Sequence, residues 1–111
     1  MHRLWHGTSN FAPKNVYECD AGLNINYSND GLWGKGVYFA VNANYSCPGY
    51  SYKIPNTNTY EVFNAYVITG DAYDSGSQTN GKLREPPKDS KGQSHDSVKG
   101  HTNGSEVFIV Y

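Results

Sequence analysis

Short runs of aromatic and β-branched residues, separated by glycine, asparagine and proline, set the pattern of this chain. Such runs favour strands, because these side chains pack well on a pleated surface. The sequence therefore predicts strands at residues 3–7, 37–40, 60–69, 97–98 and 106–111. Between the last two of these, Asn103-Gly104 is a strong signal for a tight hairpin turn.

Helical signals are few. Pro13 suits the first turn of a helix that we expect to span residues 13–19 and to end near Gly22, with its N-cap among residues 8–10. A second short helix is expected at residues 42–46. Turn-forming residues predict loops at residues 24–30, 47–59 and 70–93. The pattern as a whole is typical of a small α+β or mostly β domain.

The composition excludes several classes of function. With 111 residues and a net charge of −1, the chain suits one small domain and has no basic face for nucleic acid or an anionic membrane. No apolar run approaches the roughly 20 residues that span a bilayer, and the first residues lack a signal-peptide core. Cys19 and Cys47 form neither a disulfide framework nor a Cys-x-x-Cys zinc pair. We therefore expect an intracellular protein, cytoplasmic or nuclear, with reduced thiols and no bound metal.

Two segments carry residues suited to one kind of ligand. The first is Trp5-His6-Gly7-Thr8, and the second runs from Gly31 to Ala40 as Gly-Leu-Trp-Gly-Lys-Gly-Val-Tyr-Phe-Ala. An imidazole can bond a ribose hydroxyl, and a glycine lets the backbone approach a carboxamide closely. An aromatic face attracts a flat cationic ring. Taken alone, each segment would be a turn histidine or a tight turn into a core strand, so the argument depends on their joint occurrence.

That joint pattern resembles the NAD site of the poly(ADP-ribose) polymerase family. The family has His-Gly-Thr, then Gly-Lys-Gly-Val-Tyr-Phe-Ala, then a serine eight residues after the tyrosine, which is Ser46 here. The segment at residues 96–100, Asp-Ser-Val-Lys-Gly, resembles another that many members carry before their last strands. The resemblance implies an ADP-ribosyltransferase-like fold of mostly antiparallel sheets with one or two short helices. The resemblance runs from residue 4 to residue 111, and we expect residues 1–111 to be a single catalytic domain. That domain is whole or partial, since the family's terminal strands have no counterpart in this sequence.

The resemblance also implies roles for individual residues. His6 would bind ribose, and Gly7, followed by Thr8, would meet the nicotinamide amide. Tyr38 would stack on the nicotinamide ring, and Ser46 would bind the same amide. NAD would be the substrate and a protein would be the acceptor.

Further positions follow the family less closely. Phe39 and Ala40 complete the binding segment around the tyrosine. A second tyrosine usually covers the other face of the ring, but Gly49 holds that position, so we expect Tyr50 to serve with a one-residue insertion. Asn24 stands where members often have an arginine near the adenosine. One amide cannot replace a bidentate cation, so NAD affinity should suffer.

The third catalytic position is the main departure. Polymerising members have a glutamate before a Tyr-Ile-Val-Tyr-like strand, and aligning residues 109–111 puts Val107 at that position and Glu106 one residue early. Side chains alternate across a strand, so Glu106 would point away unless a bulge turned it inward. Family members with an aliphatic residue there transfer a single ADP-ribose or none.

Three hypotheses follow. The chain is a mono-ADP-ribosyltransferase that uses NAD and releases nicotinamide; or it is an inactive domain that binds NAD, ADP-ribose or a partner; or it is a polymerase that uses Glu106.

Overall fold

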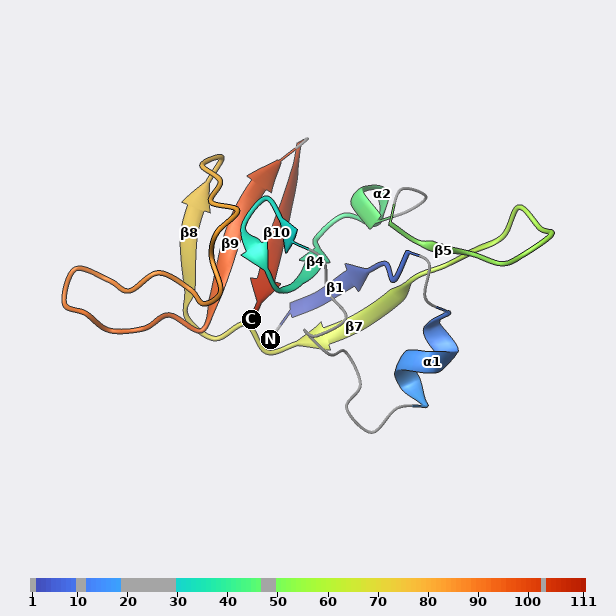
Figure 1. Ribbon diagram of the computed structural model, residues 1–111, viewed down its shortest axis with the longest axis horizontal. Coiled ribbons are helices and arrows are strands. Elements are labelled where there is room, and N and C mark those ends of the chain that lie inside the picture. The colour runs from blue at the N-terminus through green and yellow to red at the C-terminus, as the bar shows by residue number, and fades with distance from the viewer. Residues whose placement is uncertain (1, 10–11, 19–29, 47–49, 103) are drawn as a thin grey trace.

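The computed structural model describes residues 2–9, 12–18, 30–46, 50–102 and 104–111. The fold is built on a six-stranded sheet with the strand order β7-β1-β4-β10-β9-β8 (Figure 1). Its strands are β1 (His2–His6), β4 (Val37–Ala40), β7 (Phe63–Val67), β8 (Ala72–Gly76), β9 (Ser97–Thr102) and β10 (Ser105–Val110). Two small hairpins pair β2 (Asp30–Gly31) with β3 (Gly34–Lys35) and β5 (Tyr52–Lys53) with β6 (Tyr60–Glu61). The helices are α1 (Pro13–Tyr17) and α2 (Ala43–Ser46).

The large sheet is almost entirely antiparallel. The strand β1 pairs with β7 and β4, and β10 pairs with β4 and β9, all antiparallel. The strand β8 pairs with β9 in parallel, with a shift of register between Asp74 and Gly76. The mostly antiparallel α+β architecture expected from the sequence is confirmed.

Most predicted elements are present, and three loop predictions need correction. The predicted strands correspond to β1, β4, β6 with β7, β9 and β10, and β9 is longer than expected. The strand β8 lies in the predicted 70–93 loop, and β5 lies in the predicted 47–59 loop. Asp30, the last residue of the predicted 24–30 loop, belongs to β2. The strand β8 forms because it pairs with β9, more than 20 residues further along the chain, and no local pattern signals such a contact.

Both helices are shorter than the sequence predicted. The helix α1 begins with Pro13 in its first turn, as predicted, but its N-cap is Ala12, whose side chain makes no capping bond. The expected cap among residues 8–10 is therefore wrong where the structure describes those residues. The predicted end near Gly22 lies outside the described part of the chain. No helix in that part combines the length and apolar character needed to cross a membrane.

Two buried clusters lie on opposite faces of the large sheet. One consists of Leu4, Val37, Phe39, Val67 and Phe108. The other consists of Trp33, Ala40, Val98, Val107 and Ile109. We call these sides of the sheet the Phe39 face and the Trp33 face. They are distinct because successive side chains of a strand point to opposite faces.

The β2–β3 hairpin lies over β9 and β10, on the Trp33 face (Figure 1). The Lys35 amide donates to the Leu83 carbonyl at 3.1 Å, and the Asn80 amide donates to the Leu32 carbonyl at 2.9 Å. Gly34 has a φ of +83°, and a Cβ there would lie 1.9 Å from the Leu83 oxygen, so the contact requires glycine. The segment after β8 thus folds back onto the hairpin.

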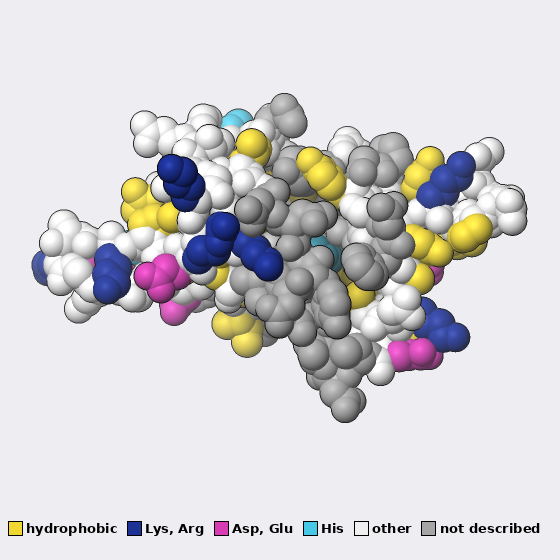
Figure 2. All heavy atoms as spheres, in the orientation of Figure 1, with side chains coloured by type: hydrophobic (Ala, Val, Ile, Leu, Met, Phe, Trp, Pro, Cys, Tyr) yellow, Lys and Arg dark blue, Asp and Glu magenta, His cyan; other side chains and the backbone are white. Residues whose placement is uncertain are grey.

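The molecular surface carries no dominant charge on the side that Figure 2 shows. Cationic and anionic side chains are both present there, and hydrophobic side chains form separate small groups. This mixture agrees with the net charge of −1.

Candidate functional site

The β1–β4 pairing brings the His6 side chain to the backbone of Tyr38, the other main predicted site residue. His6 ends β1, and its Nδ1 atom lies 2.6 Å from the carbonyl oxygen of Tyr38. The His6 ring also packs against Phe39, with 5.3 Å between ring centroids. These contacts fix the imidazole at the end of its strand.

The hydrogen bond decides the tautomer of His6. A carbonyl oxygen can only accept, so Nδ1 carries the proton and Nε2 of the neutral ring is an acceptor. Burial lowers the pKa of His6 below its usual value, and the bond to the Tyr38 carbonyl raises it by less. His6 is therefore a neutral acceptor near pH 7, which suits a hydroxyl donor such as a ribose.

Gly7 lies against the backbone of Tyr50. A Cβ at Gly7 would be 2.1 Å from the Tyr50 carbonyl oxygen, and the Ser9 amide donates to that oxygen at 2.8 Å. Thr8 is half-buried in the same turn. The side chain of Tyr50 is 51% exposed. The structure thus places the predicted backbone contact and the predicted second aromatic residue next to each other.

Tyr38 is held by the β2–β3 hairpin. Its hydroxyl donates to the Gly34 carbonyl at 2.7 Å and accepts from the Trp33 amide at 2.8 Å. A Cβ at Gly31 would lie 2.6 Å from Cζ of Tyr38, so the ring lies directly against the Gly31 backbone. The sequence analysis assigned no role to Trp33. Its position just before Gly34 was the only feature that could have indicated its contact with Tyr38.

The other predicted binding residues divide into core residues and residues that cannot be placed. Phe39 is 5% exposed and Ala40 is 1% exposed, so their side chains support the site from the core. Ser46 ends α2, and its side chain is not among those described. Asn24 and Gly49 lie outside the described residues.

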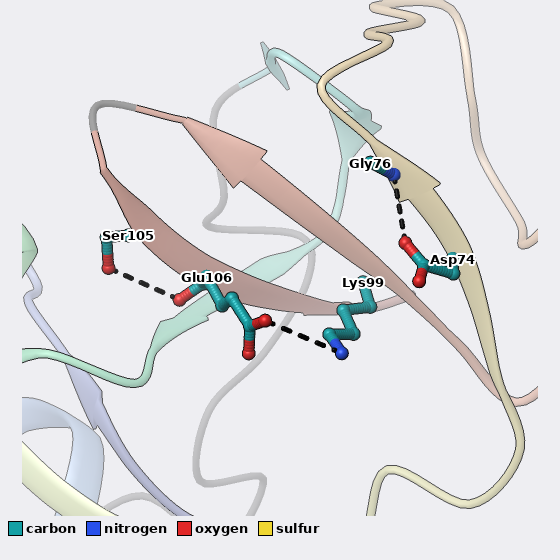
Figure 3. Close-up of polar contacts among 5 residues, drawn as sticks. All are labelled: Asp74, Gly76, Lys99, Ser105 and Glu106. Atoms are coloured by element: carbon teal, nitrogen blue, oxygen red, sulfur yellow. Dashed lines mark hydrogen bonds and ion pairs between the residues drawn. The ribbon is translucent and has the colours of Figure 1, made fainter.

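The predicted third catalytic position holds a buried aliphatic side chain. Val107 is fully buried in the Trp33 cluster and pairs with Ala40 on one side and Gly100 on the other. Glu106 points to the Phe39 face, where Oε1 lies 3.6 Å from Nζ of Lys99 and 48% of the side chain is exposed (Figure 3). The pairing of β10 runs without a bulge through its described residues, so Glu106 stays on the Phe39 face and does not share the face of Val107 and the Tyr38 ring.

Within the described residues, no three histidine, cysteine or acidic side chains gather closely enough to hold a metal ion. The predicted site residues offer the His6 imidazole beside Phe39, the Tyr38 ring against the Trp33 cluster, and glycine backbone. Such groups recognise hydroxyls, amides and flat rings.

Comparison with known proteins shows the family. The model of the poly(ADP-ribose) polymerase catalytic domain matches residues 1–110. A probable poly(ADP-ribose) polymerase of Dictyostelium discoideum is 35% identical over 108 residues, which cover 96% of this chain and 28% of that protein. The protein mono-ADP-ribosyltransferase PARP10 of Mus musculus is 36% identical over 113 residues, which cover 97% of this chain and 11% of that protein. The chain therefore corresponds to a small part of each relative, and since the family match extends over almost all of it, it belongs to the poly(ADP-ribose) polymerase catalytic-domain family.

Proposed function

We propose that this chain transfers a single ADP-ribose unit from NAD to a protein side chain and releases nicotinamide. The observation that carries the proposal is the burial of Val107, the residue predicted to hold the third catalytic position, with Glu106 on the opposite face of the sheet. A chain without a carboxylate at this position has no base of its own to activate a hydroxyl of a growing polymer. The family and the mono-ADP-ribosyltransferase relative support the same reaction class.

The residues present suit the parts of NAD that must be held during the reaction, which are the ribose and the nicotinamide ring. Nε2 of His6 can accept from a ribose hydroxyl, since Nδ1 is bonded to the Tyr38 carbonyl. Gly7 offers backbone groups beside Tyr50, whose carbonyl oxygen fills the space of the missing Cβ, and the Tyr38 ring offers an aromatic face for the cationic nicotinamide. Fixing the ribose and the leaving ring removes much of the entropic part of the barrier.

The bond that breaks joins the ribose C1′ to the nicotinamide nitrogen. Its electron pair leaves with the ring, which becomes neutral nicotinamide, and positive charge develops on the ribose as in other glycosidic cleavages. A carboxylate of the acceptor protein then bonds to C1′. Because that carboxylate is consumed in the product, it cannot assist a second addition, and one unit per acceptor is expected.

The test combines NAD turnover with adduct mass. The purified chain is incubated with NAD and a carboxylate-rich acceptor mixture, and free nicotinamide is compared with the mass added to the acceptor. We expect one ADP-ribose per nicotinamide, loss of transfer in His6→Ala and retained transfer in Glu106→Gln. Long chains that disappear in Glu106→Gln would overturn single transfer in favour of a polymerase. No nicotinamide release from the folded chain would leave an NAD-binding or interaction domain.

A further inference from the structure

The hydroxyl of Tyr38 is bonded in both of its roles. It accepts from the Trp33 amide at 2.8 Å and donates to the Gly34 carbonyl at 2.7 Å. The ring lies against Gly31, where a Cβ would collide with Cζ and the hydroxyl. The β2–β3 hairpin therefore contacts Tyr38 along its ring and at its tip, and the orientation of the ring depends on where the hairpin sits.

The hairpin is in turn anchored by the side chain of Trp33. The indole is fully buried, and its Nε1 donates to the Gln78 carbonyl at 2.8 Å and to Oγ of Ser75 at 3.2 Å. The indole also fills the space above Gly100, where a Cβ would be 2.3 Å from Cζ2. Trp33 thus links the end of β8 and the middle of β9 to the hairpin that holds Tyr38.

Tyr111 completes the arrangement from the other end of the chain. Its hydroxyl donates to the carbonyl oxygen of Trp33. The pKa of Tyr111 is raised by burial and, to a lesser extent, by the neighbouring Tyr38, so the hydroxyl stays a donor throughout the working pH range. Both polar groups of the Trp33 backbone are therefore bonded to tyrosine hydroxyls, the amide to Tyr38 and the carbonyl to Tyr111.

We propose that Trp33 and Tyr111 are positioning residues for NAD, which hold the Tyr38 ring in the orientation that stacking on nicotinamide requires. This inference rests on the proposed function. Stacking holds the nicotinamide before and during bond cleavage, so a loosened ring weakens ground state and transition state alike. Uniform weakening raises KM and leaves kcat unchanged.

The decisive variant is Tyr111→Phe, with Tyr73→Phe as its matched control. Tyr73 packs against the same buried cluster, and its hydroxyl has no hydrogen bond within the described residues. Both variants lose one hydroxyl, but only Tyr111→Phe cuts a link to Trp33. Since one hydrogen bond is lost, we expect KM for NAD to rise about three- to tenfold in Tyr111→Phe, with kcat within about twofold of wild type. Tyr73→Phe should change neither constant.

A double-mutant cycle separates positioning from a general loss of stability. If Tyr111 acts through the Tyr38 hydroxyl, Tyr111→Phe should have no further effect on KM in a Tyr38→Phe background. Should Tyr111→Phe fail to fold, Ser75→Ala tests the same network from the indole side, because Ser75 Oγ accepts from Trp33. Equal KM values for Tyr111→Phe and Tyr73→Phe would overturn this inference alone. A wild-type chain that neither binds nor cleaves NAD would overturn it together with the proposed function.

Discussion

Placing a glutamate at position 107, the predicted third catalytic position, should destabilise this chain to the point of unfolding rather than create a polymerase. Val107 is fully buried, and the other members of its cluster include Trp33, Val98 and Ile109, which are also fully buried. The variant Val107→Glu would put a carboxyl group among them. The nearest cation on β9, Lys99, is on the Phe39 face and pairs with Glu106, so it is not available as a partner.

The expected loss of stability has a constant part and a part that depends on pH. Forcing a longer side chain into the core costs about 1–3 kcal/mol, and burying an uncharged carboxyl without a partner costs about 1–3 kcal/mol more. A buried glutamate reaches a pKa of about 8–9, against about 4.3 in the unfolded chain. As pH rises above about 4.3, the unfolded state releases its proton first, so stability falls by about 1.4 kcal/mol per pH unit. The total near pH 7 is about 8 kcal/mol, which is comparable to the whole stability of a small domain.

Urea unfolding of Val107→Glu and Val107→Gln between pH 4 and 8 tests this reasoning. The glutamine has nearly the same size and cannot ionise, and any other titrating group affects both variants equally. We expect the free energies of unfolding to lie close together at pH 4 and to diverge as pH rises, with the glutamate variant less stable. A glutamate variant as stable as the glutamine variant at pH 8 would refute the dry, unpaired environment that the structure gives to Val107.

Two further predictions concern other parts of the site. Gly100→Ala should lower the free energy of unfolding by about 1–3 kcal/mol, because its Cβ would press on the rigid Trp33 ring. Gly81→Ala should cost much less, because its Cβ would meet only one atom, at 3.6 Å. Similar urea midpoints for the two variants would contradict this reasoning. Burial lowers the pKa of His6 in the folded chain. On acidification the unfolded state therefore takes up the proton first, and the free energy of unfolding falls below about pH 6.5. It levels off once the pH is below the pKa of the folded state. The pH dependence of urea unfolding should lose this contribution in His6→Gln, and an unchanged profile would contradict the assignment.

The sequence was informative wherever the structure follows a local rule. The alternation of side chains along a strand predicted that Glu106 and Val107 lie on opposite faces, and the regular pairing of β10 has that consequence. The Gly-Lys-Gly turn before β4 likewise predicted a buried strand at residues 37–40. These predictions needed only the period of a strand and the preferences of turn residues.

Contacts between distant parts of the chain were beyond that reasoning. The indole of Trp33 bonds Ser75 across 42 residues, and the Tyr111 hydroxyl bonds the Trp33 carbonyl across 78 residues. The strand β8 exists through its parallel pairing with β9, while its own sequence is rich in turn formers. Because these contacts depend on the order of strands in the sheet, only the folded structure identifies Trp33 and Tyr111 as neighbours of Tyr38.

The burial of Trp33 and the lack of a carboxylate at the third position are two consequences of one packing arrangement. The indole occupies the space left by the missing Cβ of Gly100, and Gly100 pairs directly with Val107. A charged side chain at that point would need water or a cation, and the neighbouring Trp33, Val98 and Ile109 are fully buried and apolar. An aliphatic residue therefore suits this core, and a glutamate introduced there is expected to destabilise it. Under the proposed function, the acceptor protein would supply the carboxylate for transfer, so one addition per acceptor is expected.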